Sequence, residues 1–237
     1  MKILIVSLAL SILILTMSCS ETVTPSVESV VRVRAEVGTG MVQSINSSIK
    51  IPSVLKAEVD SVKITRVRIL LKEIKFHSAS ETNENTDKAF KTGPFLYDAN
   101  ITGNNAIITE GNLPVGNYNK IKFEIHKFTG SEQTLYQNDI TFSEFATNNS
   151  YTVIMDGLAY QFGTAFPFTY KSSPTANLSL NLEPNVEISK NISTDIFLQL
   201  NPTNFMKIGN SVLDPRDASN DNDINYLIQS AIKAIKK

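Results

Sequence analysis

The chain has 237 residues, a formal net charge of −1 and a single cysteine, Cys19. Its Lys and Arg residues are mixed with Asp and Glu and form no basic patch, which argues against nucleic acid as a partner. One cysteine excludes an intramolecular disulfide, and a chain of this length can bury a core without one. The composition indicates one large domain or two small ones.

The N-terminus is predicted to be a signal peptide. Lys2 supplies a positive charge, and residues 3–15 are almost wholly apolar but shorter than the roughly 20 residues of a membrane-spanning helix. The segment 15–19, LTMSC, resembles the lipobox of bacterial lipoproteins, although Thr16 stands where the usual leucine is found. The resemblance implies cleavage before Cys19, lipid such as palmitate on that residue, and attachment to the bacterial envelope, in particular the outer membrane. An ordinary signal peptide cut nearby, with Cys19 incidental, is the alternative.

Residues 19–29 are polar and predict a flexible tether between the anchor and a folded body. The body, residues 30–213, shows apolar and polar residues in alternation, as in residues 31–37, 121–126, 178–183 and 196–200. Alternation marks strands with one buried face and is typical of antiparallel sheets. We therefore expect an all-β fold, an antiparallel β-sandwich.

The segment from Val62 to Phe76 changes phase twice, since its apolar residues stand first at even, then at odd, then again at even positions. A flat strand would turn its apolar face outward twice. Bulges near Thr65 and Lys72 would restore the register, and two strands joined by a tight corner would also do so.

Turn residues and polar stretches divide the remaining strands. Turns are predicted at Gly93-Pro94, Gly103-Asn104, Glu110-Gly111-Asn112 and Asn148-Asn149. Residues 78–92 are polar and predict a mobile surface loop, the best candidate for a binding face.

The end of the chain has helical spacing. The apolar stripe consists of Ile224, Leu227, Ile228, Ala231, Ile232 and Ile235. With Asp223 as N-cap, it predicts one amphipathic helix of about 14 residues that packs on the sandwich. Residues 214–237 are thus expected to form an Asp-rich loop followed by this helix.

Two stretches in the middle of the chain carry a family resemblance. The stretch from Arg66 to Ser78 is similar to a signature strand ending in His-Ser. Residues 113–123, LPVGNYNKIKF, are similar to a Leu-Pro-x-Gly-x-Tyr turn that runs into a strand, and Tyr97-Asp98 fits the element between. Over about residues 60–128 the chain resembles the DUF4382 type of uncharacterised bacterial lipoprotein domain. The resemblance implies a prealbumin-like β-sandwich and no particular activity.

Three groups of residues could form a ligand site. Asp214, Asp217, Asp221 and Asp223 supply the oxygen ligands that Ca²⁺ prefers, but their spacing does not match an EF-hand, and a solvated loop that caps the helix explains them as well. The aromatic residues Tyr160, Phe162, Phe166, Phe168 and Tyr170 could form a sugar-binding platform if they shared one strand, but Gly163 and Pro167 favour core packing instead. His77 and His126 are expected to be solvated rather than metal ligands.

The sequence contains no nucleophile elbow and no phosphate-binding loop. We therefore expect a non-enzymatic, envelope-anchored lipoprotein with a binding or structural role and no cofactor. Its partners would be the membrane, through the N-terminal lipid, and an envelope protein or glycan. The alternative is a Ca²⁺-dependent carbohydrate-binding module or an envelope hydrolase that uses the Asp-rich loop 214–223 and the aromatics of residues 160–170.

Overall fold

A computed structural model describes residues 28–37, 42–43, 59–81, 88–100, 106–201, 205–209 and 211–236. The predicted signal peptide, Cys19, the tether up to residue 27 and the turn at Gly103-Asn104 lie outside the described residues. Among the residues that are described, no helix is both long enough and apolar enough to cross a membrane.

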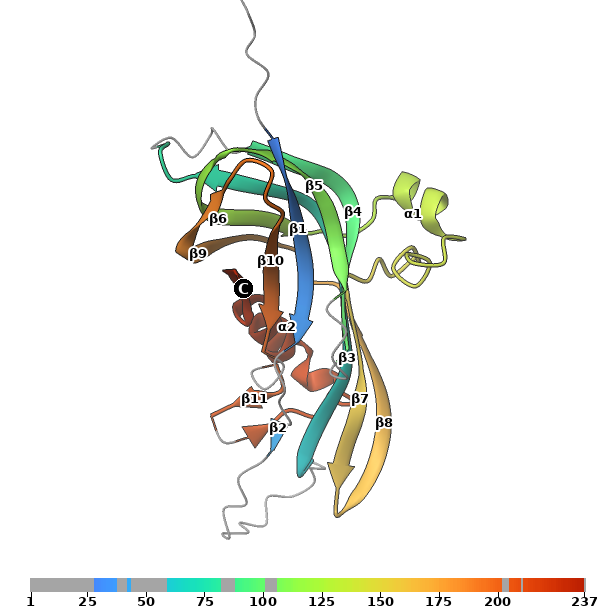
Figure 1. Cartoon of the computed structure of the whole chain (residues 1–237). Coiled ribbons are helices and arrows are strands. Elements are labelled where there is room, and N and C mark those ends of the chain that lie inside the picture. Colours follow the sequence, from blue (N-terminus) through green and yellow to red (C-terminus); the bar gives the residue numbers. More distant parts are fainter. Residues whose placement is uncertain are drawn as a thin grey trace, which may run out of the picture.

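Two sheets form the body (Figure 1). The smaller has the order β13-β10-β1-β5, with β1 at Glu28–Val37, β5 at Ile107–Pro114, β10 at Thr194–Leu200 and β13 at Ile232–Lys236. The larger has the order β8-β7-β3-β6-β9, with β2 and β4 also paired to β3. Its strands are β2 (Val42–Gln43), β3 (Ser61–Ser78), β4 (Lys88–Asn100), β6 (Gly116–Ile125), β7 (Val153–Gln161), β8 (Thr164–Ser172) and β9 (Ala176–Ile188).

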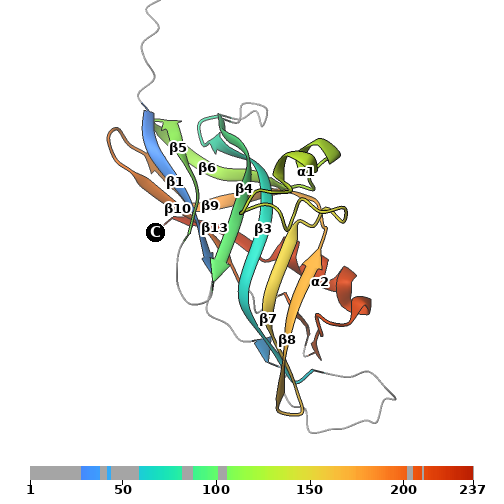
Figure 2. The same ribbon diagram turned by 90° about the vertical axis from the view of Figure 1, so that its right-hand side faces the viewer.

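Short elements complete the described chain. They are the hairpin of β11 (Lys207–Ile208) and β12 (Ser211–Val212), the helices α1 (Gly130–Tyr136) and α2 (Asp221–Ser230), and a 3₁₀ turn at Ala218–Asn220. Figure 1 shows α1 and α2 on different sides of the larger sheet, and Figure 2 gives the view from the side of α1. The expected all-β sandwich is confirmed.

The core follows the predicted alternation of apolar residues. Val31, Val33 and Ala35 of β1 face inward, and so do Ile121, Phe123 and Ile125 of β6. Tyr97 of β4 bridges the sheets, since its hydroxyl donates a hydrogen bond to the carbonyl oxygen of Glu36 at 2.7 Å. The expectation of purely antiparallel pairing is wrong in one place, because β1 and β10 pair in parallel.

The long strand β3 contains the predicted bulges. Its register against β7 shifts between Ile64 and Arg66, and its register against β4 and β6 shifts after Leu71. The shifts turn three differently phased apolar sets toward the same core, namely Val62 and Ile64, then Val67, Ile69 and Leu71, then Ile74 and Phe76. The two-strand alternative is therefore excluded, because residues 61–78 form one continuous strand.

Residues 67–71 are all buried, although alternate residues point to opposite faces of β3. Leu70 shows how an outward-pointing residue of this stretch is covered. It lies on the outer side of β3, in a second cluster of buried residues with Phe128, Phe145, Ala146 and Ile154. The segment 126–152, which contains α1, leaves the sheet at this point: the His126 N–H donates to the Leu70 carbonyl, and the Leu70 N–H donates to the Thr152 carbonyl. The segment thus covers part of the outer face with its own small core.

Helix α1 was not predicted. Its sequence, GSEQTLY, has only Leu135 and Tyr136 as apolar residues, so it contains no apolar stripe at helical spacing, and none of its residues is fully buried. It begins with a capping box, in which the Thr129 side chain accepts from the Glu132 N–H and the Glu132 carboxylate accepts from the Thr129 N–H. Such a box satisfies two backbone donors that have no partner within the helix.

The predicted C-terminal helix is correct only in its first part. Ile224 and Ile228 are buried in the main core and Leu227 packs against it, as expected. The helix ends at Ser230, however, and residues 232–236 form β13, which pairs antiparallel with β10. The N-cap is Asn220, and Asp223 lies in the first turn rather than at the cap.

Several predicted turns are also wrong. Gly93-Pro94 lies inside β4, where the pairing with β3 skips from Thr92 to Phe95, and Gly111 lies inside β5. Residues 88–92 of the predicted loop 78–92 belong to β4, and Phe90 is buried. At Gly93-Pro94 a bulge accommodates the predicted turn residues, and a glycine without Cβ tolerates the close neighbour there, since a Cβ on Gly93 would stand 2.6 Å from the Phe95 ring. Gly111 instead pairs with Val31 of β1 in regular register.

Candidate functional site

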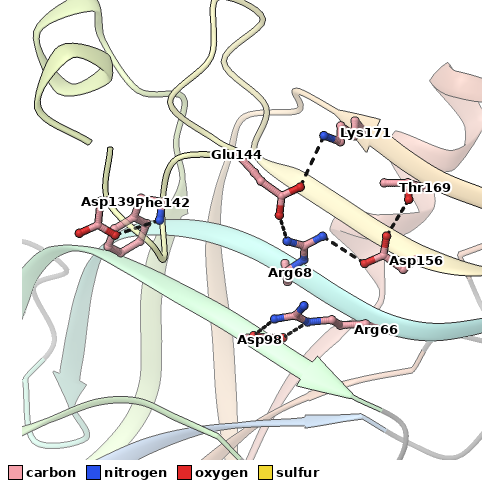
Figure 3. Close-up of polar contacts among 9 residues, drawn as sticks. All are labelled: Arg66, Arg68, Asp98, Asp139, Phe142, Glu144, Asp156, Thr169 and Lys171. Carbon is pink, nitrogen blue, oxygen red and sulfur yellow. Dashed lines mark hydrogen bonds and ion pairs between the residues drawn. The ribbon is translucent and has the colours of Figure 1, made fainter. Parts of the chain in front are cut away.

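An extended polar network lies on the outer face of the larger sheet, where β3 carries Arg66 and Arg68 (Figure 3), with Leu70 two residues further along the strand. Alternation along a strand gives these three residues a common face. Leu70 is covered by the segment 126–152, and Arg68, only 8% exposed, lies at the edge of that cover. We call Arg66, Arg68, Asp98, Glu144, Asp156, Thr169 and Lys171 the charged face.

Arg68 is the centre of the charged face. Its guanidinium forms one ion pair with Glu144 and another, at 3.1 Å, with Asp156 of β7. Glu144 also lies 3.6 Å from the Lys171 amine, and Asp156 accepts a hydrogen bond from the Thr169 hydroxyl at 2.8 Å. Arg68 Nε is buried without a hydrogen-bond partner. Arg68 therefore connects β3, β7 and the segment 126–152, and the carboxylates connect it onward to β8.

Arg66 forms a second, bidentate ion pair on the same face. Its Nε and Nη2 donate to the two carboxylate oxygens of Asp98, at 2.8 and 2.6 Å. The hydrogen-bonded Asp98 carboxylate raises the pKa of Arg66, against the opposing effect of burial, and the charges of Asp156 and Glu144 act in the same direction as Asp98. The two arginines and their carboxylates therefore form one electrostatic unit.

Local structure holds Glu144 in place. The Asp139 carboxylate accepts hydrogen bonds from the N–H groups of Thr141 and Phe142, at 2.7 and 3.0 Å, and so caps the turn that leads to Glu144. The Phe142 ring packs edge-on against Tyr136 and Phe128. The apolar contacts and the cap hold this turn, and with it Glu144, beside Arg68.

The charged face is suited to holding a surface segment against the sheet rather than to proton transfer. Asp98, Glu144 and Asp156 each have a cationic partner within 3.1 Å, and Thr169 is the only hydroxyl that the face holds. A nucleophilic mechanism needs a base within reach of that hydroxyl, and the base would have to be a carboxylate that already binds an arginine. What the arrangement does chemically is to attach the segment 126–152 rigidly to the sheet.

The four aspartates of the predicted calcium site do different things. Asp214 binds the Arg216 guanidinium at 2.7–3.2 Å, and Asp217 accepts from the Ser219 N–H to cap the 3₁₀ turn. Asp221 and Asp223 lie in the first turn of α2, where negative charge is favoured. Within the described part of the chain, no three His, Cys, Asp or Glu residues are grouped so that they could hold a metal ion. The geometry gives the calcium-site hypothesis no support.

The aromatic residues of the predicted sugar platform lie on two strands rather than one. Phe162 and Gly163 form the turn between β7 and β8, both with positive φ, and Phe162 is 87% exposed. Phe168 and Tyr170 are buried against the core, while the Phe166 ring lies 5.0 Å below the Arg216 guanidinium. Burial and the nearby Asp221 raise the pKa of Tyr170 to about 12. The predicted core packing is therefore correct for Phe168 and Tyr170.

The two histidines differ from each other. His77 is buried, 4% exposed, with Nε2 3.2 Å from the Glu81 carbonyl oxygen, so the prediction of a solvated side chain is wrong there. His126 is half-buried and lies 3.4 Å from Glu124 and 3.5 Å from Glu132. The two side chains have different partners and form no shared site.

Sequence reasoning missed the charged face, although it contained one signal. Arg66 and Arg68 occupy alternate positions beside the apolar residues 69–71 of β3, and an arginine there must either reach water or find a carboxylate. The partner Glu144 is 76 residues away. No local pattern identifies such a partner.

Comparison with known families assigns the chain to a family. Residues 55–215 match the family described as Domain of unknown function (DUF4382), which confirms the resemblance found in the strand from Arg66 to Ser78 and in the Leu-Pro-x-Gly-x-Tyr turn. No curated protein and no solved structure matches the chain. The matched range includes most of the sandwich and every residue of the charged face, and the chain therefore belongs to the DUF4382 family.

Proposed function

We propose that this protein is a lipoprotein of the bacterial envelope, anchored through lipid on Cys19, and that its domain has a non-enzymatic binding or structural role. The observation that carries the anchoring is the lipobox-like segment 15–19, which ends in the single cysteine of the sequence. The position of β1 then says where such an anchor would hold the domain. Strand β1 begins at Glu28, nine residues after Cys19, and lies between β10 and β5 inside the smaller sheet. Nine residues span at most about 30 Å, so an anchor at Cys19 would keep the sandwich close to the membrane.

The segment 126–152 is the surface that best supports a binding role. It stands outside the sandwich, and it is fixed by the cluster around Leu70 and by the ion pair of Arg68 with Glu144. It also presents Leu135 and Ile140 to solvent, the latter fully exposed. A rigid surface loses less conformational entropy on binding than a mobile one. An envelope protein or a glycan is the class of ligand that such a displayed surface would meet.

The anchor is tested by replacing Cys19. In the native envelope, Cys19→Ala should abolish incorporation of a labelled fatty acid and leave a soluble or uncleaved chain, while the control Ser26→Ala should behave as wild type. A cleaved Cys19→Ala protein that still partitions fully with membranes would refute the lipoprotein assignment.

The binding role is tested by a photo-reactive amino acid placed at Ile140 in the full chain, in cells. The matched control is Tyr226, which is also exposed but lies on α2. Discrete cross-linked products at Ile140 that are absent at Tyr226 are expected. Equal products at both positions, or none at Ile140, would contradict a binding role for segment 126–152.

A further inference from the structure

The first residues of β1 are held between two turns at one end of the sandwich. Glu28 pairs with Pro114 at the end of β5. The buried Ser29 hydroxyl donates to the Ser189 carbonyl oxygen at 2.7 Å and accepts from the Asn191 N–H at 3.2 Å. The turn between β5 and β6 and the turn between β9 and β10 therefore flank the place where the chain joins the sandwich, at the top of Figure 1.

Both turns carry an exposed apolar side chain. Val115, between β5 and β6, is 47% exposed, and Ile192, between β9 and β10, is 58% exposed. Lys190 is exposed on the same turn as Ile192. An isolated apolar residue at a surface needs no explanation, but two at the tips of adjacent turns, with a cation beside them, match the side chains found at a membrane interface.

We propose that Val115, Lys190 and Ile192 form a membrane-contacting end that rests on the lipid bilayer to which Cys19 is anchored. The inference rests on the proposed anchoring. The chain between Cys19 and Glu28 reaches at most about 30 Å, and it joins the sandwich between these two turns. Of the described surface, this end is the one nearest to the anchor along the chain. The apolar tips would enter the interfacial layer, and Lys190 would lie among anionic headgroups.

The opposite end of the sandwich is far from the anchor. Strand β3 connects the two ends, since Ser78 pairs with Tyr118 near the first and Ser61 pairs with Tyr160 near the second. Its 18 residues follow a path of about 55–60 Å. Phe162, in the turn beyond Tyr160, would face away from the bilayer, and the segment 126–152 would project sideways (Figure 1).

The orientation can be measured with tryptophan, because the chain contains none. Four single-tryptophan variants serve as probes: Val115→Trp, Ile192→Trp, Ile140→Trp and Phe162→Trp. The mature chain from Cys19 onward is coupled through its one thiol to a maleimide lipid in vesicles of phosphatidylethanolamine and phosphatidylglycerol. Brominated phosphatidylcholine in the same vesicles then quenches any tryptophan that enters the bilayer.

Val115→Trp and Ile192→Trp should show a blue-shifted emission and at least twofold quenching, whereas Ile140→Trp and Phe162→Trp should match the uncoupled protein. Adding Val115→Asp to the Ile192→Trp variant should remove most of the quenching, and the control Ile208→Asp should leave it unchanged. Any other pattern, such as quenching at Phe162→Trp or at no position, overturns the proposal. Because the coupling is chemical, the result does not depend on whether the cell acylates Cys19, so the two proposals can fail separately.

Discussion

The hydroxyl of Tyr118 donates a hydrogen bond to the carbonyl oxygen of Pro114, four residues earlier, at 2.9 Å. The bond closes the turn between β5 and β6, and the buried ring packs edge-on against Phe76 of β3, with the centroids 5.9 Å apart. The Leu-Pro-x-Gly-x-Tyr motif therefore has a structural role. It fixes the corner at which the chain passes from the smaller sheet to the larger.

Tyr118→Phe keeps the ring and removes the hydrogen bond, so it should lower the free energy of unfolding by about 0.5–1.5 kcal/mol. Tyr118→Ala also removes the ring and should cost about 3 kcal/mol or more. Tyr226→Phe on the exposed side of α2 is the matched control and should have almost no effect. Urea denaturation followed by circular dichroism measures all three, and a Tyr118→Phe protein as stable as wild type would contradict the role given to the bond.

Breaking the ion pairs of Arg68 should loosen the segment 126–152. Arg68→Met leaves Glu144 and Asp156 without this partner, but both carboxylates are partly exposed and can rehydrate, so we expect a loss of about 1–3 kcal/mol. Glu144→Gln should cost less than about 1 kcal/mol. Hydrogen exchange should rise within residues 126–152 more than in β6 or β9.

A double-mutant cycle of Arg68→Met and Glu144→Gln separates the pair from its surroundings. The double variant should be less destabilised than the sum of the single variants. Additive losses, together with unchanged exchange in residues 126–152, would show that the ion pair does not attach the segment.

Asp195 should make stability depend on pH. Burial alone would raise the pKa of the Asp195 carboxyl, but hydrogen bonds and charge from Arg34 and Arg32 together lower it. A carboxyl whose pKa is lowered by folding stabilises the protein above its unfolded pKa of about 3.9, and that contribution is lost as the pH falls through the folded value. Asp195→Asn should therefore cost about 1 kcal/mol at pH 7.

The difference between Asp195→Asn and wild type should narrow as the pH falls below about 4, because protonation removes the same charge from the native carboxyl. Glu183→Gln, at an exposed position of β9, is the control, and its free energy of unfolding should stay close to that of wild type at each pH. Thermal unfolding at pH 7, 4 and 3 provides the comparison. A difference that stays constant with pH would mean that the arginines do not hold Asp195 ionised.

Helix α2 should be a structural part of the core. Ile228 is fully buried, so Ile228→Asp places a charge in apolar surroundings and should cost several kcal/mol, about half or more of the stability of a typical domain. Tyr226→Asp on the exposed side of the same helix should change the free energy of unfolding by less than about 0.5 kcal/mol. An unshifted melting curve for Ile228→Asp would mean that the apolar stripe serves a partner instead.

Much of this fold is determined by local patterns that depend on the sequence alone. Alternation requires that Val31, Val33 and Ala35 share one face, and the two changes of phase between Val62 and Phe76 require two bulges if the strand is continuous. The same reasoning places Ile224 and Ile228 on one side of a helix. These features follow from the period of a strand or a helix, which is a property of the backbone.

Other features depend on contacts between distant residues, and only the tertiary structure decided them. Residues 232–236 have a spacing compatible with a helix, but the free edge of β10 supplies backbone partners that make them a strand. The burial of Arg68 depends on a segment that crosses the outer face of β3 and brings Glu144 to it across 76 residues. The free energy of such pairs depends on burial and geometry, which the order of residues along β3 does not contain.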